Sequence, residues 1–340
     1  MVRIVFFFTY SFFLYEIFNK IKFVLLGSHS GENFADLFRK VLDQFECTNQ
    51  LFSITADNAS TNNKMAEWIE KEVPTFNHRT HLLGCVAHVI NLAAKSALST
   101  FGTIGEDDED HELPTSMMDV RYITNEPGRV NVNLKTVLKR VHGFSVFVRG
   151  SPQQRERFAQ TVRFIQPDQF NDNITVLVLD VETRWNSTLH MFQRAMTLKK
   201  SYNHFCSEND DCHKFKLNDD EWEQVSYIIA MLEPLGAATE LLCGSEYPTL
   251  NSALPIYLIL IKRLTIIQNG LYNQGQLIDP AKKLFDKLNQ YLQLALKKPL
   301  YICAMVMDPR FKMHFWKSQI GIIEQHCSHS LEDIQSIFIN

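Results

Sequence analysis

Apolar positions recur with helical periodicity over most of the chain. Between 32 and 46 they fall every three or four residues, which predicts an amphipathic helix that buries one face. The same spacing predicts helices on both sides of a break at 150–152, where Gly-Ser-Pro interrupts the pattern. It also predicts helices over 63–72, 82–98, 186–205, 221–243, 252–268, 280–298 and 312–327.

Two short runs read instead as strands. Residues 51–56 are rich in β-forming residues, and 174–179 form a continuous apolar run that is typical of a buried strand. Strands separated by helices predict an α/β fold, a mixed sheet flanked by helices with a helical tail. Two strands do not complete a sheet, so we expect the others at or before the N-terminus.

Composition narrows the class of protein. The chain has 340 residues, of which 45% are hydrophobic and 21% charged, which excludes a disordered chain, a collagen-like fibre and a multi-pass membrane protein. Its net charge of −4 means that any nucleic-acid binding must use local basic surface. Seven cysteines without a CxxC pair favour a reducing compartment. The sequence contains neither a phosphate-binding glycine loop nor a nucleophile elbow, so no motif in it points to a small-molecule substrate.

Shifts in composition divide the chain. Residues 1–27 resemble the apolar part of a signal peptide but lack a cleavage site, and their apolar run is too short to span a membrane. Six carboxylates in seven residues at 106–112 predict a solvated acidic linker. The predicted segments are 1–27, a first core part at 28–102, a linker at 103–130, a second core part at 131–205 and a helical domain at 206–340.

Charge is unevenly distributed. Residues 129–163 contain eight lysines and arginines against one glutamate, and 282–317 contain eight against two aspartates. Residues 208–240 contain nine acids against two lysines. The basic stretches suit a phosphate backbone, and they equally suit an ordinary solvated surface.

Asp57 is a candidate metal ligand. It follows the predicted strand at 51–56, and open α/β sheets bind ligands at the carboxyl ends of their strands. A carboxylate among small polar residues suits a hard cation such as Mg²⁺. The alternative is that Asp57 is a turn residue or a helix cap.

Two further pairs could carry chemistry. Cys85 and His88 lie three apart on one face of a predicted helix, so they could be two of the four ligands of a structural zinc, or could pack and hydrogen-bond without metal. Arg184 suits bidentate contact with phosphate. Trp185 could stack on a base or pack in the core.

Several blocks in order resemble the hAT superfamily of DNA transposases. They are 27–33 (Gly-Ser-His-Ser-Gly-Glu-Asn), 53–63 (Ser-Ile-Thr-Ala-Asp-Asn-Ala-Ser-Thr-Asn-Asn), 84–92 (Gly-Cys-Val-Ala-His-Val-Ile-Asn-Leu), 179–188 (Leu-Asp-Val-Glu-Thr-Arg-Trp-Asn-Ser-Thr), 247–249 (Tyr-Pro-Thr) and 304–312 (Ala-Met-Val-Met-Asp-Pro-Arg-Phe-Lys). The resemblance extends from about residue 22 to about residue 317.

The resemblance implies a ribonuclease-H-like core with a helical insertion, which uses three acidic residues and a divalent metal to cut and join DNA. Asp57 matches the second acidic residue and so a Mg²⁺ ligand. Cys85 and His88 match a Cys-x-x-His element. Arg184 and Trp185 match an Arg-Trp element that contacts DNA, whose tryptophan is associated with a flipped base. A nuclear location follows from the DNA substrate.

The chain also departs from that family pattern. No aspartate precedes Asp36, no glutamate near the C-terminus matches the family's third acid, and no zinc-finger domain precedes the core. Two-metal phosphoryl transfer needs several carboxylates to hold cations about 4 Å apart. We therefore expect a DNA-binding transposase remnant or truncated gene product without catalytic activity. The alternatives are a fragment of an active transposase, or an interaction module that self-associates through the aromatic residues Phe311, Phe315 and Trp316.

Overall fold

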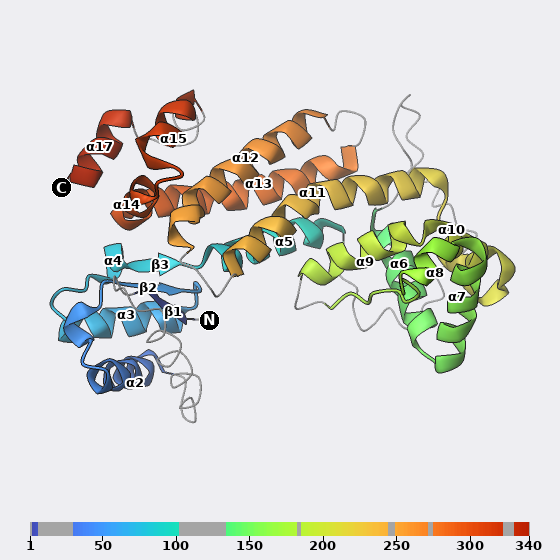
Figure 1. Ribbon diagram of the computed structural model, residues 1–340, viewed down its shortest axis with the longest axis horizontal. Coiled ribbons are helices and arrows are strands. Elements are labelled where there is room, and N and C mark those ends of the chain that lie inside the picture. The colour runs from blue at the N-terminus through green and yellow to red at the C-terminus, as the bar shows by residue number, and fades with distance from the viewer. Residues whose placement is uncertain are drawn as a thin grey trace. The chain divides into compact units, whose positions relative to one another are not determined.

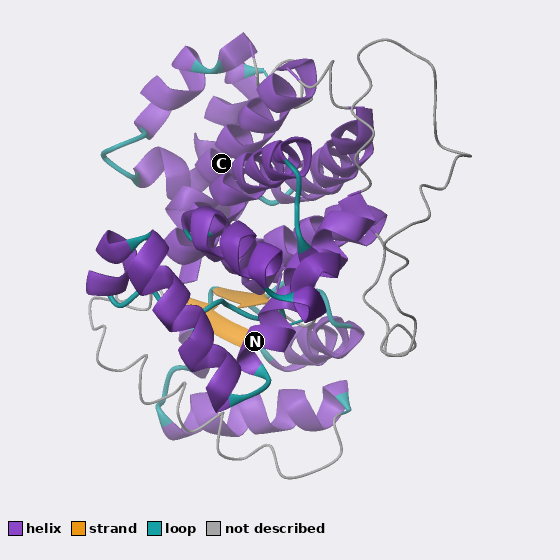
Figure 2. Ribbon diagram, turned by 90° about the vertical axis from the view of Figure 1, so that its right-hand side faces the viewer, coloured by secondary structure: helices purple, strands orange, loops and turns teal. Residues whose placement is uncertain are grey.

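The computed structural model describes residues 2–5, 30–101, 134–181, 185–243, 249–270, 275–321 and 330–339. Most of these residues are helical, as Figure 2 shows. The chain divides into two compact units. Unit 1 comprises Met1–Ile90, Ala238–Ile261 and Leu288–Asn340, and unit 2 comprises Asn91–Ala237 and Lys262–Lys287.

Unit 1 contains a three-stranded sheet in the order β1 (Val2–Val5), β2 (Ser53–Ala56), β3 (Leu82–Gly84). β1 runs antiparallel to β2 with Val2 opposite Ala56, and β2 runs parallel to β3 with Ala56 opposite Gly84. Helices α2 (Gly31–Gln44) and α3 (Ser60–Glu72) pack against each other beside this sheet (Figure 1). The short helices η1 (Thr48–Gln50) and α4 (His78–His81) link these elements.

The core of this part of unit 1 comes from the buried stripes of α2 and α3 and from β2. The predicted helix is confirmed: Phe38, Val41 and Leu42 of its apolar stripe are buried, and Phe34 and Phe45 are partly buried and pack against the same core. The buried residues are Ala35, Phe38, Val41, Leu42, Cys47, Leu51, Ile54, Ala56, Met65, Ala66, Ile69, Val73, Phe76 and Leu82.

Helices make up the rest of the described chain in unit 1 and link the two units. α14 (Pro299–Met307), α15 (Lys312–Ser318) and α17 (Leu331–Ile339) lie in unit 1. The helices shared by the units are α5 (Val86–Leu98), α11 (Asp219–Cys243), α12 (Leu250–Gly270) and α13 (Gly275–Leu296). By length and composition α11 and α12 could each cross a membrane, but about half of each apolar stretch is buried, as in the core helix of a soluble protein.

Unit 2 is built around an aromatic cluster. Its further helices are α6 (Leu134–Arg149), α7 (Pro152–Ile165), α8 (Pro167–Asn171), α9 (Trp185–Thr197) and α10 (Lys199–Glu208), with the short helices η2 (Ser99–Phe101) and η5 (Asp210–Phe215). The Phe144 ring lies 4.2 Å from the Tyr202 ring and 5.6 Å from the Phe158 ring, centroid to centroid. The predicted break between α6 and α7 is confirmed, because Ser151 caps α7 by accepting from the backbone N–H of Gln154 at 3.1 Å.

The predicted fold class is wrong. The described residues are mostly helical, and only β2 and β3 pair in parallel, so they do not form the mixed α/β, ribonuclease-H-like core that we expect from the sequence. The run at 174–179 is not a strand. Arg194 of α9 donates to the carbonyl of Val176 at 2.7 Å, and Arg149 of α6 donates to that of Leu177 at 3.0 Å. These two backbone carbonyls are therefore hydrogen-bonded by arginine side chains and not by the backbone of another strand.

Other boundaries differ in detail. Leu82–Gly84 form β3 rather than the start of a helix, and the helix predicted over 186–205 is interrupted at Leu198. α14 and α17 have no counterpart among the predicted elements. Of the aromatic residues in the interaction hypothesis, Trp316 is fully buried, whereas Phe311 and Phe315 are partly exposed and pack against each other edge to face.

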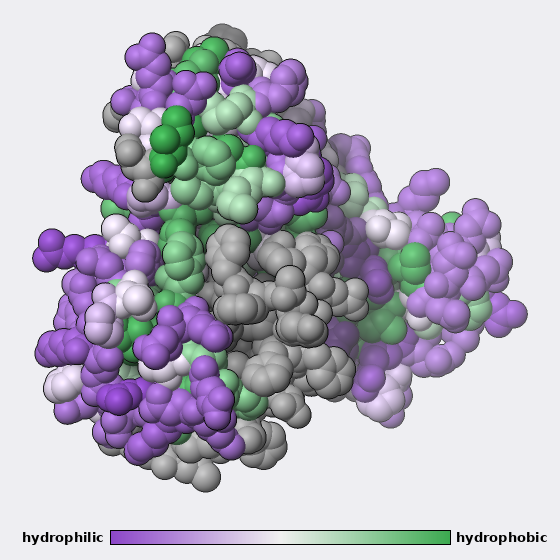
Figure 3. Space-filling model, turned by 60° about the vertical axis from the view of Figure 1, so that its left-hand side comes forward, coloured by the Kyte–Doolittle hydropathy of each residue, from purple (hydrophilic) through white to green (hydrophobic). Residues whose placement is uncertain are grey.

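Figure 3 shows one side of the molecule by hydropathy. Hydrophilic side chains cover most of its lower part, and hydrophobic side chains gather in the upper part. Most of the predicted N-terminal segment 1–27 and the whole of the predicted linker 103–130, with its acidic run at 106–112, lie outside the described residues.

Candidate functional site

The carboxyl ends of β2 and β3 bring two of the candidate residues together. Because Ala56 pairs with Gly84 in parallel register, the residues that follow them, Asp57 and Cys85, leave the sheet at the same edge. The backbone N–H of Cys85 donates to the carbonyl of Ala56 at 2.8 Å, which continues the ladder by one bond.

Local hydrogen bonds hold the Asp57 carboxylate. Its Oδ1 accepts from the side-chain amide of Asn62 at 2.7 Å and from the backbone N–H of Ala59 at 3.2 Å. The buried Asn62 amide also donates to the carbonyl of Asp57 at 3.2 Å. The bond to Ala59 closes a turn of the kind that aspartate favours, and the N-cap of α3 is Ala59 rather than Asp57.

These contacts also affect ionisation. Partial burial acts to raise the pKa of Asp57, but hydrogen bonds to the carboxylate outweigh it, and the positive charge of His88 makes a smaller contribution in the same direction, so the pKa lies below that of an ordinary aspartate. Asp57 therefore carries a negative charge at neutral pH, as a cation ligand must.

Cys85 and His88 lie at the start of α5. Cys85 precedes the helix, and its carbonyl accepts from the backbone N–H of Val89 at 3.1 Å, while His88 lies in the first turn. Both side chains are partly exposed. Within the described residues, no three His, Cys, Asp or Glu side chains are placed to hold a metal ion. The described side chains around Asp57 therefore do not fit a two-metal centre. Among Asp57, Cys85 and His88, only Asp57 offers the oxygen ligand that Mg²⁺ prefers.

Two residues near the start of α14 close the outer edge of β3. The Tyr301 hydroxyl donates to the carbonyl of Gly84 at 2.8 Å, and the Lys298 ammonium donates to the carbonyl of Leu82. Burial raises the pKa of Tyr301 and lowers that of Lys298. Sequence reasoning missed both residues, because they lie more than 200 positions from β3 and no local pattern marks them.

The Arg-Trp element lies in unit 2, and Arg184 falls outside the described residues. Trp185 is the first residue of α9 and is only 4% exposed, which favours the core-packing alternative. Asp180 precedes the element and accepts from the hydroxyls of Ser187 at 2.7 Å and Thr188 at 2.9 Å, so it fixes the approach of the chain to α9.

Comparisons with known proteins match several parts of the chain. Residues 129–231 match the family described as ZBED1 RNase-like helical domain. A putative transcriptional regulator, tpeD, from Talaromyces stipitatus is 26% identical over 301 residues, which cover 86% of this chain and 32% of that protein. No solved structure matches.

Two plant relatives extend this result. The zinc finger BED domain-containing protein RICESLEEPER 2 of Oryza sativa is 23% identical over 86% of this chain and 36% of its own length. The putative AC transposase of Zea mays is 22% identical over 66% of this chain and 24% of its own length. The chain thus spans about a third or less of these curated relatives.

Proposed function

We propose that the chain, which is similar to hAT-family transposase-like proteins, binds double-stranded DNA. The observation that carries this proposal is the match of 129–231 to a domain of such proteins together with the basic stretch 129–163 at its start. In that stretch Lys135, Arg155 and Arg163 are exposed. Contact with phosphates requires cations that solvent can reach. A nuclear location is part of the same proposal, since DNA is the ligand.

Salt dependence tests this function. We expect the 340-residue protein to bind a labelled duplex in fluorescence anisotropy, with an affinity that falls by orders of magnitude between about 50 mM and about 200 mM salt. Absence of binding at the lower salt concentration would overturn the proposal. An affinity independent of salt would also contradict it, because phosphate contacts release counterions.

We assign Asp57 a single-ligand role toward Mg²⁺. The carboxylate is ionised and lies at the end of β2, but among the described residues it belongs to no group of three or more His, Cys, Asp or Glu side chains that could hold a metal ion. One carboxylate with water gives a weak site. In this polypeptide Asp57 would hold Mg²⁺. Cleavage of a DNA strand uses two metal ions, and a single carboxylate ligand would not hold both of them.

A second candidate function is DNA cleavage within a longer protein. The match to a putative AC transposase favours it, and the chain spans only a quarter of that relative. A cleavage assay with transposon-end DNA distinguishes DNA binding alone from DNA cleavage. The assay compares residues 1–340 with a longer polypeptide expressed from the same locus. Metal-dependent cleavage by the longer polypeptide and none by residues 1–340 would support both parts of the proposal.

A further inference from the structure

The hairpin of α12 and α13 contains a group of basic residues that sequence reasoning covered only in part. Residues 271–274 join the two helices, which run side by side in opposite directions (Figure 1). Arg263 lies seven residues before the end of α12, and Lys282 lies seven residues after the start of α13. Lys262 and Lys283 are each one residue further from the link. The four cations therefore lie about equally far along their helices from residues 271–274.

The residues that flank these four cations on each helix are buried, which leaves the cations on the exposed faces of α12 and α13. On α12 the flanking Ile261 and Leu264 are buried, and on α13 the flanking Ala281 and Leu284 are buried. These apolar residues fix the faces that pack into the protein. Lys262, Arg263, Lys282 and Lys283 are exposed.

The charges of this group are offset only in part, by Asp279 and Asp286, which lie four residues from Lys283 and Lys282 on α13. Within the described part of the chain, none of these four residues forms an ion pair, and α12 contains no acidic residue. The acids of the hairpin are Asp279 and Asp286 of α13, so residues 262–287 carry five basic side chains against two acidic ones. Lys262 and Arg263 are neighbours on one helix and Lys282 and Lys283 are neighbours on the other, so each pair lies within the Debye length of about 10 Å at 0.1 M salt and acts together on an anion.

We propose that Lys262, Arg263, Lys282 and Lys283 form a contact surface for the phosphate backbone of DNA, the hairpin surface. This inference rests on the proposed DNA binding and names one surface that performs it. A duplex carries about one negative charge per 1.7 Å of its axis, so cations on two adjacent helices can each meet a phosphate. Such contacts position the protein on the duplex and do not read its sequence.

An anionic membrane is the other ligand to weigh. Ile266 and Ile278 are exposed near the cations, and a basic helix with exposed apolar residues can lie on a lipid surface. The main apolar faces of both helices are, however, buried in the protein and cannot enter lipid. DNA, which needs only the exposed cations, is therefore the favoured ligand.

The test compares charge-removing variants at two places. The hairpin variant is Lys262→Gln, Arg263→Gln, Lys282→Gln and Lys283→Gln together. The matched control removes the same number of charges from exposed positions of unit 1 outside both basic stretches, with Lys40→Gln, Lys64→Gln, Lys71→Gln and Arg79→Gln. Because each phosphate contact contributes about 0.9 to the slope of log affinity against log salt, we expect the hairpin variant to lower that slope by about 2–3. We expect the control to change it by less than about 1.

Two further measurements keep the outcomes distinct. Circular dichroism and urea unfolding should show that the hairpin variant folds, and Lys282→Arg with Lys283→Arg should retain the wild-type slope. If the wild type binds DNA and the hairpin variant keeps its slope, this inference is wrong and the proposed function stands. If the wild type does not bind, both fail. If the variant loses binding to vesicles of equal parts phosphatidylserine and phosphatidylcholine but not to DNA, the surface is a membrane site and the inference is wrong.

Discussion

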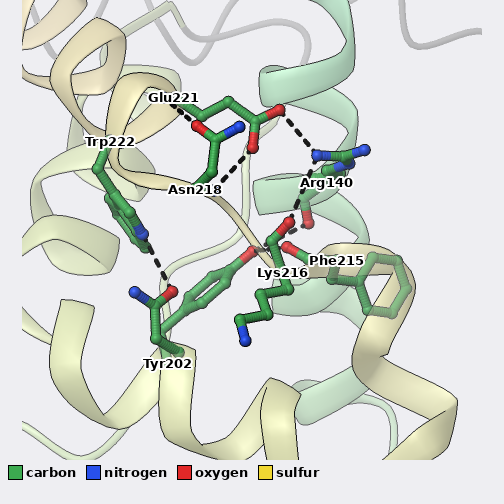
Figure 4. A network of polar contacts seen from close by, with 8 residues as sticks. Arg140, Tyr202, Phe215, Lys216, Asn218, Glu221 and Trp222 are labelled. Carbon is green, nitrogen blue, oxygen red and sulfur yellow. Dashed lines mark hydrogen bonds and ion pairs between the residues drawn. The ribbon is translucent and has the colours of Figure 1, made fainter. Parts of the chain in front are cut away.

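The Arg140 guanidinium and the Glu221 carboxylate lie 2.7 Å apart and join α6 to the first turn of α11 (Figure 4). Glu221 also accepts from the backbone N–H of Asn218 at 2.9 Å, while the Asn218 side chain accepts from the backbone N–H of Glu221 at 2.8 Å. This reciprocal pair caps α11. The Tyr202 hydroxyl donates to the carbonyl of Phe215 at 2.9 Å beside it. The Glu221 carboxylate thus caps α11 and also forms an ion pair with α6, which lies far from α11 in the sequence.

Replacing Glu221 should destabilise the protein. The side chain is 9% exposed and that of Arg140 is 26% exposed, so Glu221→Ala leaves a largely buried cation without its partner and removes the cap. Loss of one partner of a fully buried pair costs about 3–5 kcal/mol, and the partial exposure of Arg140 reduces this to about 2–3 kcal/mol. Urea unfolding followed by circular dichroism measures the loss. The control is Glu233→Ala, an exposed position on the same helix, and equal midpoints for the two variants would contradict the account.

Gly31 is required for the close approach of α2 to α3. A Cβ at this position would lie 2.5 Å from the Lys64 Cβ and 3.0 Å from the backbone oxygen of Thr61. Because backbone atoms cannot move aside as a flexible side chain can, Gly31→Ala should lower the free energy of unfolding by about 1–3 kcal/mol. Gly321→Ala is the control, since no atom lies within 4 Å of that Cβ. A melting temperature for Gly31→Ala as high as that of the control would show that the helices do not pack in this way.

The helices that could be predicted from the sequence are those with a strong apolar period. The stripe of α2 and the Gly-Ser-Pro break before α7 are local signals, and both predictions are confirmed. The prediction of a strand at 174–179 was wrong, because an apolar run does not show which groups will donate hydrogen bonds to its backbone carbonyls. Here the side chains of Arg149 and Arg194 donate them. β3 was missed because three residues give no period.

The candidate site was predictable only in part. Asp57 could be found because it follows a recognisable strand, and the parallel register that sets Cys85 beside it could not. Tyr301 and Lys298 reach β3 from α14, which is far away in sequence. The hairpin surface combines Lys262 and Arg263 with Lys282 and Lys283 from another helix, so no single window of the sequence displays it. The roles of Asp57, Cys85, His88, Arg184 and Trp185 stay predictions.

His81 should make the protein less stable in mild acid. Its ring stacks on Phe52 and its Nδ1 accepts from the backbone N–H of Asn77 at 3.1 Å, which requires an unprotonated Nδ1. Burial lowers the pKa of His81 below its usual value of 6.5. The unfolded chain therefore binds a proton more readily, so this contribution to stability is present above about pH 6.5 and is lost as the pH falls toward the folded-state pKa.

The measurement is the free energy of unfolding between about pH 7.5 and about pH 5.5. We expect His81→Gln to depend less on pH than the wild type over this range, whereas His204→Gln, at an exposed position, should keep the wild-type dependence. His142, whose pKa burial also lowers, accounts for part of the dependence that His81→Gln retains. Identical pH profiles for the wild type and His81→Gln would refute this role.

The cysteines of unit 2 should resist thiol reagents. Cys206 and Cys212 are fully buried, and burial raises the pKa of Cys206 well above its usual value and that of Cys212 to about 11. Since the thiolate is the reactive form, both should stay unmodified by iodoacetamide at neutral pH, while the exposed Cys243 is modified. Peptide mass spectrometry assigns each site. Modification of Cys206 as fast as that of Cys243 in the native protein would contradict the packing of α10 against η5.

The most direct test of DNA binding without cleavage uses one reaction. The 340-residue protein is incubated with supercoiled plasmid and Mg²⁺ at a low salt concentration, and both retardation and nicking of the plasmid are followed on gels. The account predicts retardation that added salt abolishes, and no nicking above that of an Asp57→Ala control. Mg²⁺-dependent nicking by the wild type that is lost in Asp57→Ala, or the absence of any retardation, would contradict it.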